Sequence, residues 1–206
     1  MLSLGLTFDT AAGARAGAGL LGPNAVIQLG AALRAAPGLA GAAERVFARA
    51  GCTRLLASAP DEMIDEAIPA RLFAALWREL PSAQAAAIAH QAGHRTGAYV
   101  LAHRIPAPAR WALRRLPPFL AARLLLQAIR RNAWTFAGSG FCSVAPGDPA
   151  LITISRNPLA MPGGVWHVGV FECLFRALVN EGTQIGHAGD VVAGGPDCRF
   201  TIDWRG

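Results

Sequence analysis

The residues of this chain that could do chemistry gather between Leu80 and Gly147. This stretch holds eight arginines and three histidines, but neither Asp nor Glu. Guanidinium groups without neighbouring carboxylates must find counter-charges elsewhere, in water, a phosphate, a lipid head-group or an acidic ligand. Large apolar residues, such as Trp111, Phe119 and Leu124, are interspersed among the arginines. One hypothesis is therefore that the stretch binds a large, flat, apolar molecule with acidic edges.

Three side chains of different chemistry recur at four-residue spacing within this stretch. Arg95, Tyr99 and His103 would share one face of a helix. A guanidinium can bind a carboxylate, and an imidazole can supply an axial ligand to a metal held in a flat macrocycle. The alternative is an ordinary solvated helix face, and both interpretations stay open on the sequence alone.

Other patterns that could support chemistry are incomplete. His90 and His94 have the i, i+4 spacing of a metal pair, but the sequence offers neither the glutamate of an H-E-x-x-H motif nor an evident third ligand. The four cysteines lie far apart without a C-x-x-C pair, which predicts reduced thiols. No nucleophile motif or phosphate-binding loop is visible. We therefore expect no metal site built by the protein itself.

Arginine supplies all of the basic side-chain charge apart from histidine, with 19 Arg, no Lys and a net charge of +6. Nucleic acid is a natural partner for a basic chain, but these arginines lie among leucines and no nucleic-acid-binding motif is present. We expect no nucleic-acid partner. No window is long and apolar enough to span a bilayer, and the N-terminus lacks the basic region of a signal peptide, so we expect a cytoplasmic protein.

The hydrophobic pattern divides the chain into a helical half and a β-rich half. Residues 1–22 are rich in Gly and Ala and are expected to be poorly ordered. Residues 23–131 repeat apolar residues every three or four positions, which predicts helices. Residues 132–206 predict a β-β-α-β-β unit, with a first strand from about Trp134 and a helix from Val165 that ends at Gly182. The expected fold class is α+β, with a four-stranded antiparallel sheet packed with the helices as one domain.

Several segments carry a family resemblance. They are RTGAYVLAHRIPAPAR (95–110), AIRRNAWTFAGSG (128–140), and NPLAMP, FECLFRALV and GGPDCRF between residues 157 and 200. Together they resemble the bacteriochlorophyll-synthesis proteins called 4-vinyl reductases, over nearly the whole chain after Pro23. The resemblance implies a small-molecule-binding fold related to a haem-binding gas-sensor domain. Relatives often carry cysteines where this chain has Ala160 and Asp190, and only Cys198 matches, which argues against a cysteine-based metal site.

The family name implies reduction of a ring vinyl group to ethyl on a divinyl magnesium tetrapyrrole. The sequence shows no NAD, flavin or iron–sulfur motif that could supply electrons. We therefore expect a carrier or accessory protein without an intrinsic cofactor, which binds a magnesium tetrapyrrole and presents it to other bacteriochlorophyll-synthesis enzymes. One alternative is the 8-vinyl (4-vinyl) reductase itself, using an external reductant. Another is a peripheral adaptor that places Trp111–Arg131 on the anionic lipid of the photosynthetic membrane.

A magnesium tetrapyrrole needs an axial ligand, carboxylate partners and apolar ring contacts. His103 is the expected axial ligand, with His167 in reserve. The expected carboxylate partners are Arg95, Arg104 and Arg131, beside Tyr99, and the expected ring contacts are Trp111, Phe119, Leu124 and Trp134.

A homodimer is also expected from the pattern of the predicted helix in the β-rich half. Phe171, Leu174, Phe175 and Leu178 would give this helix one apolar face, and the Arg-rich helices could supply another.

Overall fold

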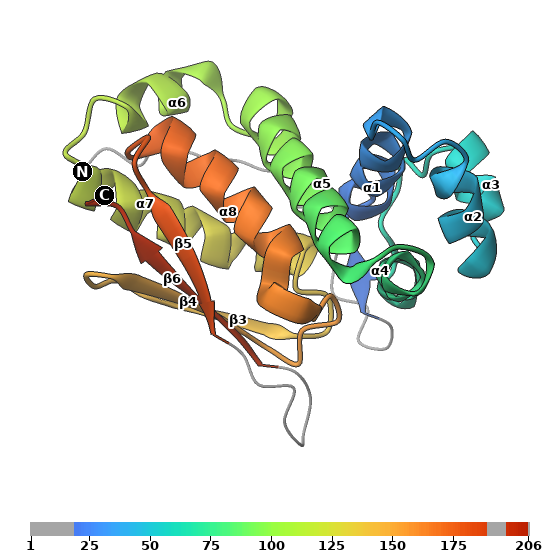
Figure 1. Ribbon diagram of the computed structural model, residues 1–206. Coiled ribbons are helices and arrows are strands. Elements are labelled where there is room, and N and C mark those ends of the chain that lie inside the picture. The colour runs from blue at the N-terminus through green and yellow to red at the C-terminus, as the bar shows by residue number, and fades with distance from the viewer. Residues whose placement is uncertain (1–18, 189–196, 206) are drawn as a thin grey trace.

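The computed structural model describes residues 19–188 and 197–205, and it shows helices followed by an antiparallel sheet. The α+β fold class predicted from the sequence is therefore confirmed. In Figure 1 the sheet lies at the base, helix α8 (Val165–Leu178) runs across it, and helix α5 (Ser82–His103) lies beside α8. Helices α1 to α4 group on the other side of α5.

The helices of the N-terminal half are short segments separated largely by prolines and glycines. Pro81, Pro106 and Pro117 each stand at the N-cap of a helix, where the missing N–H of proline costs nothing. No helix in the described part of the chain is long and apolar enough to cross a membrane. Besides α5, these helices are α1 (Asn24–Ala35), α2 (Ala42–Arg49), α3 (Thr53–Ala57), α4 (Ala67–Glu79), α6 (Ala107–Leu113) and α7 (Pro118–Arg131).

The sheet has the strand order β3-β4-β6-β5, and every neighbouring pair is antiparallel. Its strands are β3 (Phe141–Ala145), β4 (Ala150–Ser155), β5 (Gln184–Ala188) and β6 (Cys198–Asp203). Alternate residues on the two central strands are fully buried, among them Ile152, Ile154, Phe200 and Ile202. These apolar side chains form one face of the sheet, and this face packs against α8.

The contact between α5 and α8 joins the two halves of the chain. Gly93 and Gly97 of α5 face α8, and a Cβ atom added to Gly93 would lie only 1.9 Å from the carbonyl oxygen of Trp166. Gly169 of α8 faces α5 in the same way, and a Cβ atom added to it would lie 2.3 Å from the carbonyl oxygen of His90. The buried residues on both sides of this contact belong to one continuous hydrophobic core that extends from Leu21 to Trp204.

Three expectations about local structure need correction. Residues 1–18 lie outside the described part, but Leu20–Leu21 form strand β1, which pairs with β2 (Ile64–Asp65), so the end of the segment expected to be poorly ordered has a fixed place. Trp134 lies in a 3₁₀ turn, η1 (Ala133–Thr135), and the first strand of the sheet begins only at Phe141.

The third correction concerns the end of α8. This helix ends at Leu178 rather than at Gly182. The side chain of Asn180 donates a hydrogen bond to the carbonyl of Trp204 (2.8 Å) and accepts one from the backbone N–H of Gly182 (3.0 Å). These bonds turn the chain into β5 before a glycine cap is reached.

Candidate ligand-binding surface

The last turns of α5 carry the side chains expected to bind a carboxylate and a metal. Arg95 and His103 are exposed, and Tyr99 between them is half-buried. The ring centroids of Tyr99 and His103 lie 4.7 Å apart, with the ring planes inclined by 40°. Arg104 follows directly as the C-cap, and its backbone N–H donates to the carbonyl of Val100 at 2.9 Å. The structure therefore brings together a cation, a phenol and an imidazole on one accessible surface.

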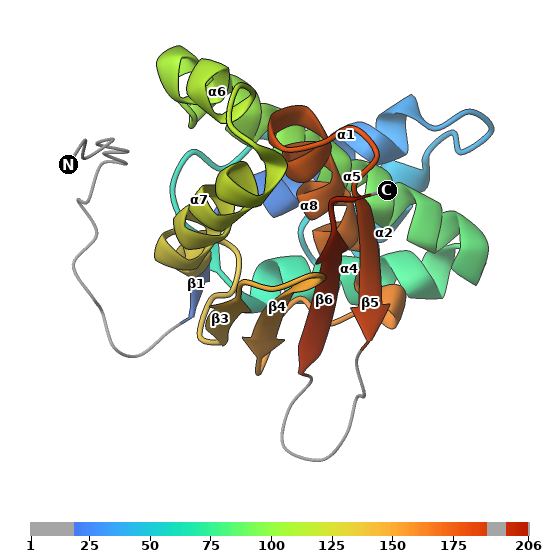
Figure 2. The ribbon, with the colours of Figure 1, turned by 90° about the vertical axis from the view of Figure 1, so that its left-hand side faces the viewer.

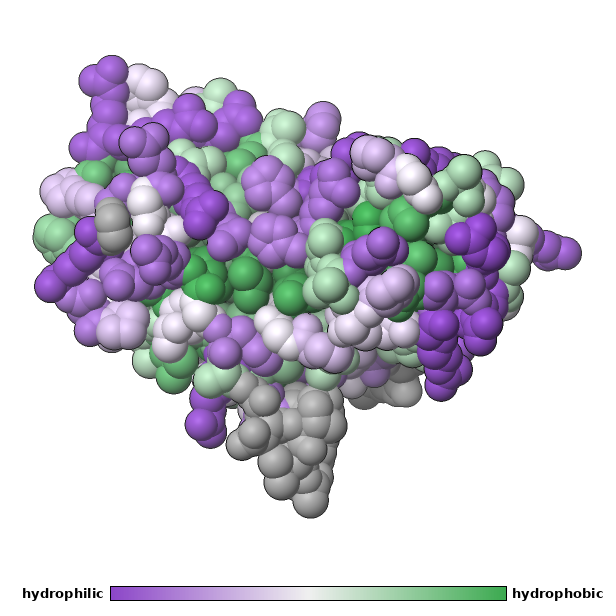
Figure 3. Space-filling model, viewed as in Figure 1, coloured by the Kyte–Doolittle hydropathy of each residue, from purple (hydrophilic) through white to green (hydrophobic). Residues whose placement is uncertain are grey.

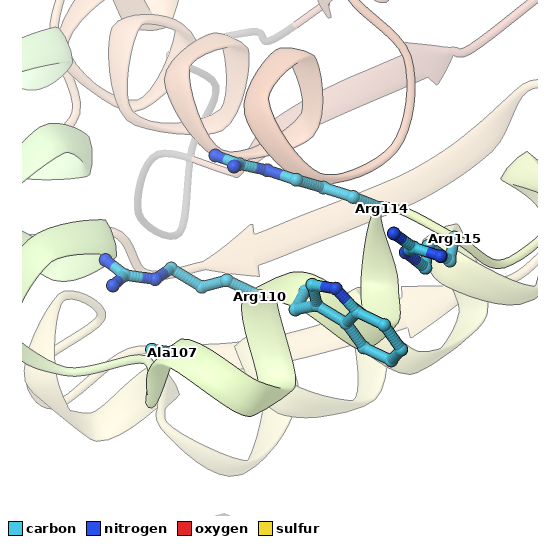
Figure 4. Close-up of a pocket in the computed structure, with 5 residues that line it drawn as sticks. Ala107, Arg110, Arg114 and Arg115 are labelled. Carbon is cyan, nitrogen blue, oxygen red and sulfur yellow. The ribbon is translucent and has the colours of Figure 1, made fainter.

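Helix α6 begins four residues after His103 and forms an open hollow. The guanidinium carbon of Arg115 lies 4.4 Å from the centroid of the Trp111 ring, which is a cation–π distance. Trp111 is 60% exposed, so a large aromatic surface is held in place at the rim of the hollow. The hollow, shown in Figure 4, has a volume of about 640 Å³ and is lined by Ala107, Arg110, Trp111, Arg114 and Arg115.

Two of these arginines tie α6 to its neighbours. Arg110 donates a hydrogen bond to the carbonyl of Leu101 in α5. The Nε atom of Arg114 donates to the carbonyl of Ala177, near the end of α8, at 3.0 Å, and Figure 4 shows this side chain reaching toward that helix. Through these two bonds α6 is fixed beside the end of α5, so the hollow and the Arg95–His103 stripe lie on adjacent elements.

The positive charge of this region is not neutralised by acidic side chains in the described structure. Among residues 19–188 and 197–205, none of the eight arginines of the acid-free stretch has a carboxylate oxygen within 4.0 Å. Within the described residues, the stretch contributes one such contact, between His90 and Glu172 (2.8 Å). The other ion pairs use arginines from other parts of the chain, such as Arg49 with Glu79. In Figure 3 hydrophilic side chains crowd the region of α6, at the upper left. This surface is therefore available to an anionic partner.

Four of the predicted ligand contacts lie on a different surface, formed by α7 and η1. Phe119 is 55% exposed, Leu124 and Trp134 are each 44% exposed, and Arg131 is exposed as well. Phe119 and Arg123 line a second open hollow, of about 570 Å³, together with residues 146–148 and the chain end at Trp204 and Arg205. The structure thus divides the predicted contacts between an α5–α6 surface and an α7 surface.

His167, the reserve axial ligand, lies inside the core. It is only 1% exposed, and neither ring nitrogen has a hydrogen-bond partner among the described residues. Its ring is surrounded by the rings of Trp166, Phe136, Phe171 and Phe200, at centroid distances of 4.8–6.2 Å. Burial lowers the pKa of His167 from 6.5 to about 3, an effect that the nearby backbone of Phe136 partly opposes and His187 reinforces. The imidazole is therefore neutral at physiological pH.

The cysteines are buried free thiols rather than a cluster. Burial raises the pKa of Cys142 to about 11, and it also raises the pKa values of Cys173 and Cys198. The side-chain amide of Asn157 donates to the sulfur of Cys198 at 3.3 Å. Among the described residues, no group of three or more His, Cys, Asp or Glu side chains could hold a metal ion.

Three arginines beside Trp111 were not among the ligand contacts predicted from the sequence. Arg110, Arg114 and Arg115 line the α6 hollow with it. The signal was present in the spacing, because Trp111 and Arg115 are i, i+4 neighbours and so are Arg110 and Arg114. What the spacing could not show was that these side chains point away from the core.

The fold and the surface define an α+β protein with a basic, aromatic face suited to a flat, acidic ligand. Comparison with known proteins makes the class more specific. The chain is 40% identical over 189 residues to the bacteriochlorophyll synthase 23 kDa chain of Cereibacter sphaeroides, covering 88% of this chain and 89% of that protein. It is also 40% identical over 119 residues to the protein of the same name from Rhodobacter capsulatus, covering 55% and 56% of the two chains. The chain belongs to this family of bacteriochlorophyll synthase 23 kDa chains. No general family profile matches it.

Proposed function

We propose that this protein takes part in bacteriochlorophyll synthesis by binding a magnesium tetrapyrrole and presenting it to other enzymes of that synthesis. The names of its relatives support the pathway. The observation that carries the binding proposal is the α6 hollow, which Arg110, Arg114 and Arg115 line together with the exposed indole of Trp111, on the helix that follows Tyr99 and His103 of α5. A chlorophyll precursor has a flat apolar ring, acidic substituents and a magnesium ion with a free axial position, and this surface offers a partner for each.

Each group on the α5–α6 surface has a proposed role. His103 is the proposed axial ligand of magnesium, because its imidazole is exposed and reachable, whereas His167 is enclosed by aromatic rings. Arg95 and Arg104 are the proposed carboxylate partners on α5, and the arginines of α6 extend the same positive surface. Trp111 is the proposed contact for the ring face. The α7 residues named earlier lie on other elements, and the proposal does not depend on them.

The reductase named by the sequence resemblance is the alternative function. Reduction of a vinyl group to ethyl requires two electrons and two protons from a donor outside this chain. The carrier proposal requires only binding and release, which an open, solvent-facing surface suits. The two proposals are separated by whether the protein alone converts a divinyl substrate in the presence of NADPH.

The test is an absorption titration of the purified protein with magnesium protoporphyrin. Wild type should give a saturable spectral shift at micromolar ligand. His103→Ala should change the spectrum of the bound pigment, because the axial ligand is lost. Arg104→Ala should weaken binding several-fold with little spectral change, since an exposed charge pair contributes at most about 1 kcal/mol. His94→Ala, on an exposed position of the same helix, is the matched control and should behave as wild type.

Two outcomes would count against this proposal. The carrier function fails if wild type gives no spectral shift and no fluorescence quenching with the magnesium porphyrin. The reductase function replaces it if the protein alone binds a divinyl pigment and consumes NADPH while the vinyl group is reduced.

A further inference from the structure

A second surface of the molecule combines exposed apolar side chains with unpaired arginines. Helix α7 buries Ala121, Ala122, Leu125, Leu126 and Ile129 in the core, so its opposite face is turned outward. That outward face and the adjoining η1 turn carry four large apolar residues. They are Phe119 (55% exposed), Leu120 (38%), Leu124 (44%) and Trp134 (44%). Together with Arg123, Arg130 and Arg131, these residues form the surface that we call the α7 face.

The same face carries three arginines and no acid. Arg123, Arg130 and Arg131 are exposed, and none has a carboxylate within 4.0 Å among the described residues. Most helices of soluble proteins turn a mixed acidic and basic face to water. Apart from Pro118 and the partly exposed Ala128, α7 exposes only arginine, glutamine and large apolar side chains, which matches the pattern of helices that lie in the plane of a membrane surface. Long arginine side chains can reach the phosphates while leucine, phenylalanine and tryptophan enter the acyl boundary.

Within the described part of the chain, the arrangement of elements leaves this side of the molecule accessible. Figure 2 shows α6, α7, β1 and β3 along one side of the fold. The 14 residues of α7 give a helix roughly 21 Å long, which is enough to place both ends of the face on a flat surface. The hollow beside Phe119 and Arg123 adjoins one end of this face.

We propose that the α7 face docks the protein on an anionic lipid bilayer, with the helix parallel to the surface. Charge complementarity identifies the partner, because a face of arginines and large apolar side chains fits phospholipid head-groups, and the one carboxylate in the adjoining hollow, Asp148, is paired with Arg205. This inference does not rest on tetrapyrrole binding, since it concerns another surface and is tested without pigment.

The experiment is flotation of the pigment-free protein with vesicles. Wild type should float with vesicles of mixed phosphatidylcholine and phosphatidylglycerol but not with phosphatidylcholine alone, and high salt should weaken the binding. The triple variant Arg123→Gln, Arg130→Gln, Arg131→Gln should reduce the partition coefficient by roughly tenfold or more, because each basic residue near an anionic surface contributes to binding. The double variant Phe119→Ser, Leu124→Ser should also reduce it while leaving the circular dichroism unchanged.

The matched control removes the same charge elsewhere. Arg54, Arg71 and Arg78 are exposed on α3 and α4, and replacing all three with Gln should leave flotation close to wild type if the face matters rather than the net charge. An equal loss in both triple variants would overturn the proposal in favour of unspecific attraction. Absence of flotation with anionic vesicles would also overturn it, as would a change of oligomeric mass in the α7 variants, which would identify a second copy of the chain as the occupant.

Discussion

At the scale of single residues, the neutral imidazole of His167 should make the stability of the fold depend on pH. The folded protein keeps His167 unprotonated down to a pKa of about 3, whereas the unfolded chain protonates it below about 6.5. The unfolded state therefore binds more protons, and the free energy of unfolding falls as the pH drops below 6.5, by about 1.4 kcal/mol per pH unit. The loss from this residue levels off only near pH 3. Burial lowers the pKa of His187 too, which adds to the same trend.

Urea denaturation followed at several pH values would measure this effect. Between about pH 7.5 and 5, wild type should lose about 2 kcal/mol of unfolding free energy through His167, and His167→Leu should lose correspondingly less. His94→Gln, on the surface of α5, should retain the full wild-type dependence. Parallel pH profiles for wild type and His167→Leu would show that the buried imidazole is not the cause.

The side chains of the candidate surface could be predicted by type and spacing, but their exposure could not. The absence of acids between Leu80 and Gly147 is visible in the sequence, and so is the four-residue spacing of Tyr99 and His103. The neighbouring sequence does not distinguish the exposed His103 from the enclosed His167, because each histidine has an apolar residue directly before it. The difference arises from the sheet, whose Phe200 approaches His167 from a distant part of the chain.

At the scale of elements, the contact between α5 and α8 should tolerate no side chain at Gly93. An added Cβ would collide with backbone atoms of Trp166 at 1.9 and 2.8 Å, and backbone cannot rotate away as a side chain can. We expect Gly93→Ala to destabilise the protein by about 2–3 kcal/mol or more, despite the better helix propensity of Ala. Chemical denaturation monitored by circular dichroism would measure the change.

Gly30→Ala provides the matched control within another helix. Its added Cβ would first meet the tip of Leu56 at 3.3 Å and the ring edge of Phe47 at 3.5 Å. These groups can shift by a few tenths of an ångström, so this variant should lie within about 1 kcal/mol of wild type. Equal destabilisation at both positions would indicate a general intolerance of the helices rather than a close backbone contact.

The element order was predictable because the hydrophobic period changes from helical to alternating along the chain. The strands β4 and β6 show strict alternation of buried and less buried residues, which is a clear signal. The pairing of β1 with β2 was missed because each strand has two residues and the partners are more than forty positions apart. The end of α8 was misplaced because the side chain of Asn180 bonds to Trp204, a contact that no local pattern reveals.

At the scale of the whole molecule, we expect a homodimer, but the structure changes the surface that could form it. Phe171, Leu174, Phe175 and Leu178, the face considered from the sequence, are buried within the chain and cannot meet a second copy. The edge strand β3 pairs only with β4 in the described structure, and its first residue, Phe141, is 66% exposed. An exposed edge strand with an apolar residue is a natural site for symmetric pairing.

Light scattering of the purified protein would test this expectation. Wild type should return twice the chain mass of 21.5 kDa, and Phe141→Glu should return the mass of one chain. The arginine triple variant of α7 should leave the mass unchanged, because the two surfaces differ. A wild-type mass of 21.5 kDa at micromolar concentration would exclude a stable dimer.

The hydrogen bonds that anchor α6 have a consequence for how readily its arginines could capture an anion. Arg114 uses its Nε–H on the carbonyl of Ala177, and within the described part of the chain its two terminal amino groups keep their donors free. The guanidinium of Arg115 is positioned by its cation–π contact with the Trp111 ring. Free arginine side chains lose much rotational entropy when they close on a carboxylate, whereas these have already lost part of it on folding. A carboxylate would therefore bind guanidinium groups that are already oriented, and its binding would cost less conformational entropy than binding to freely rotating arginine side chains.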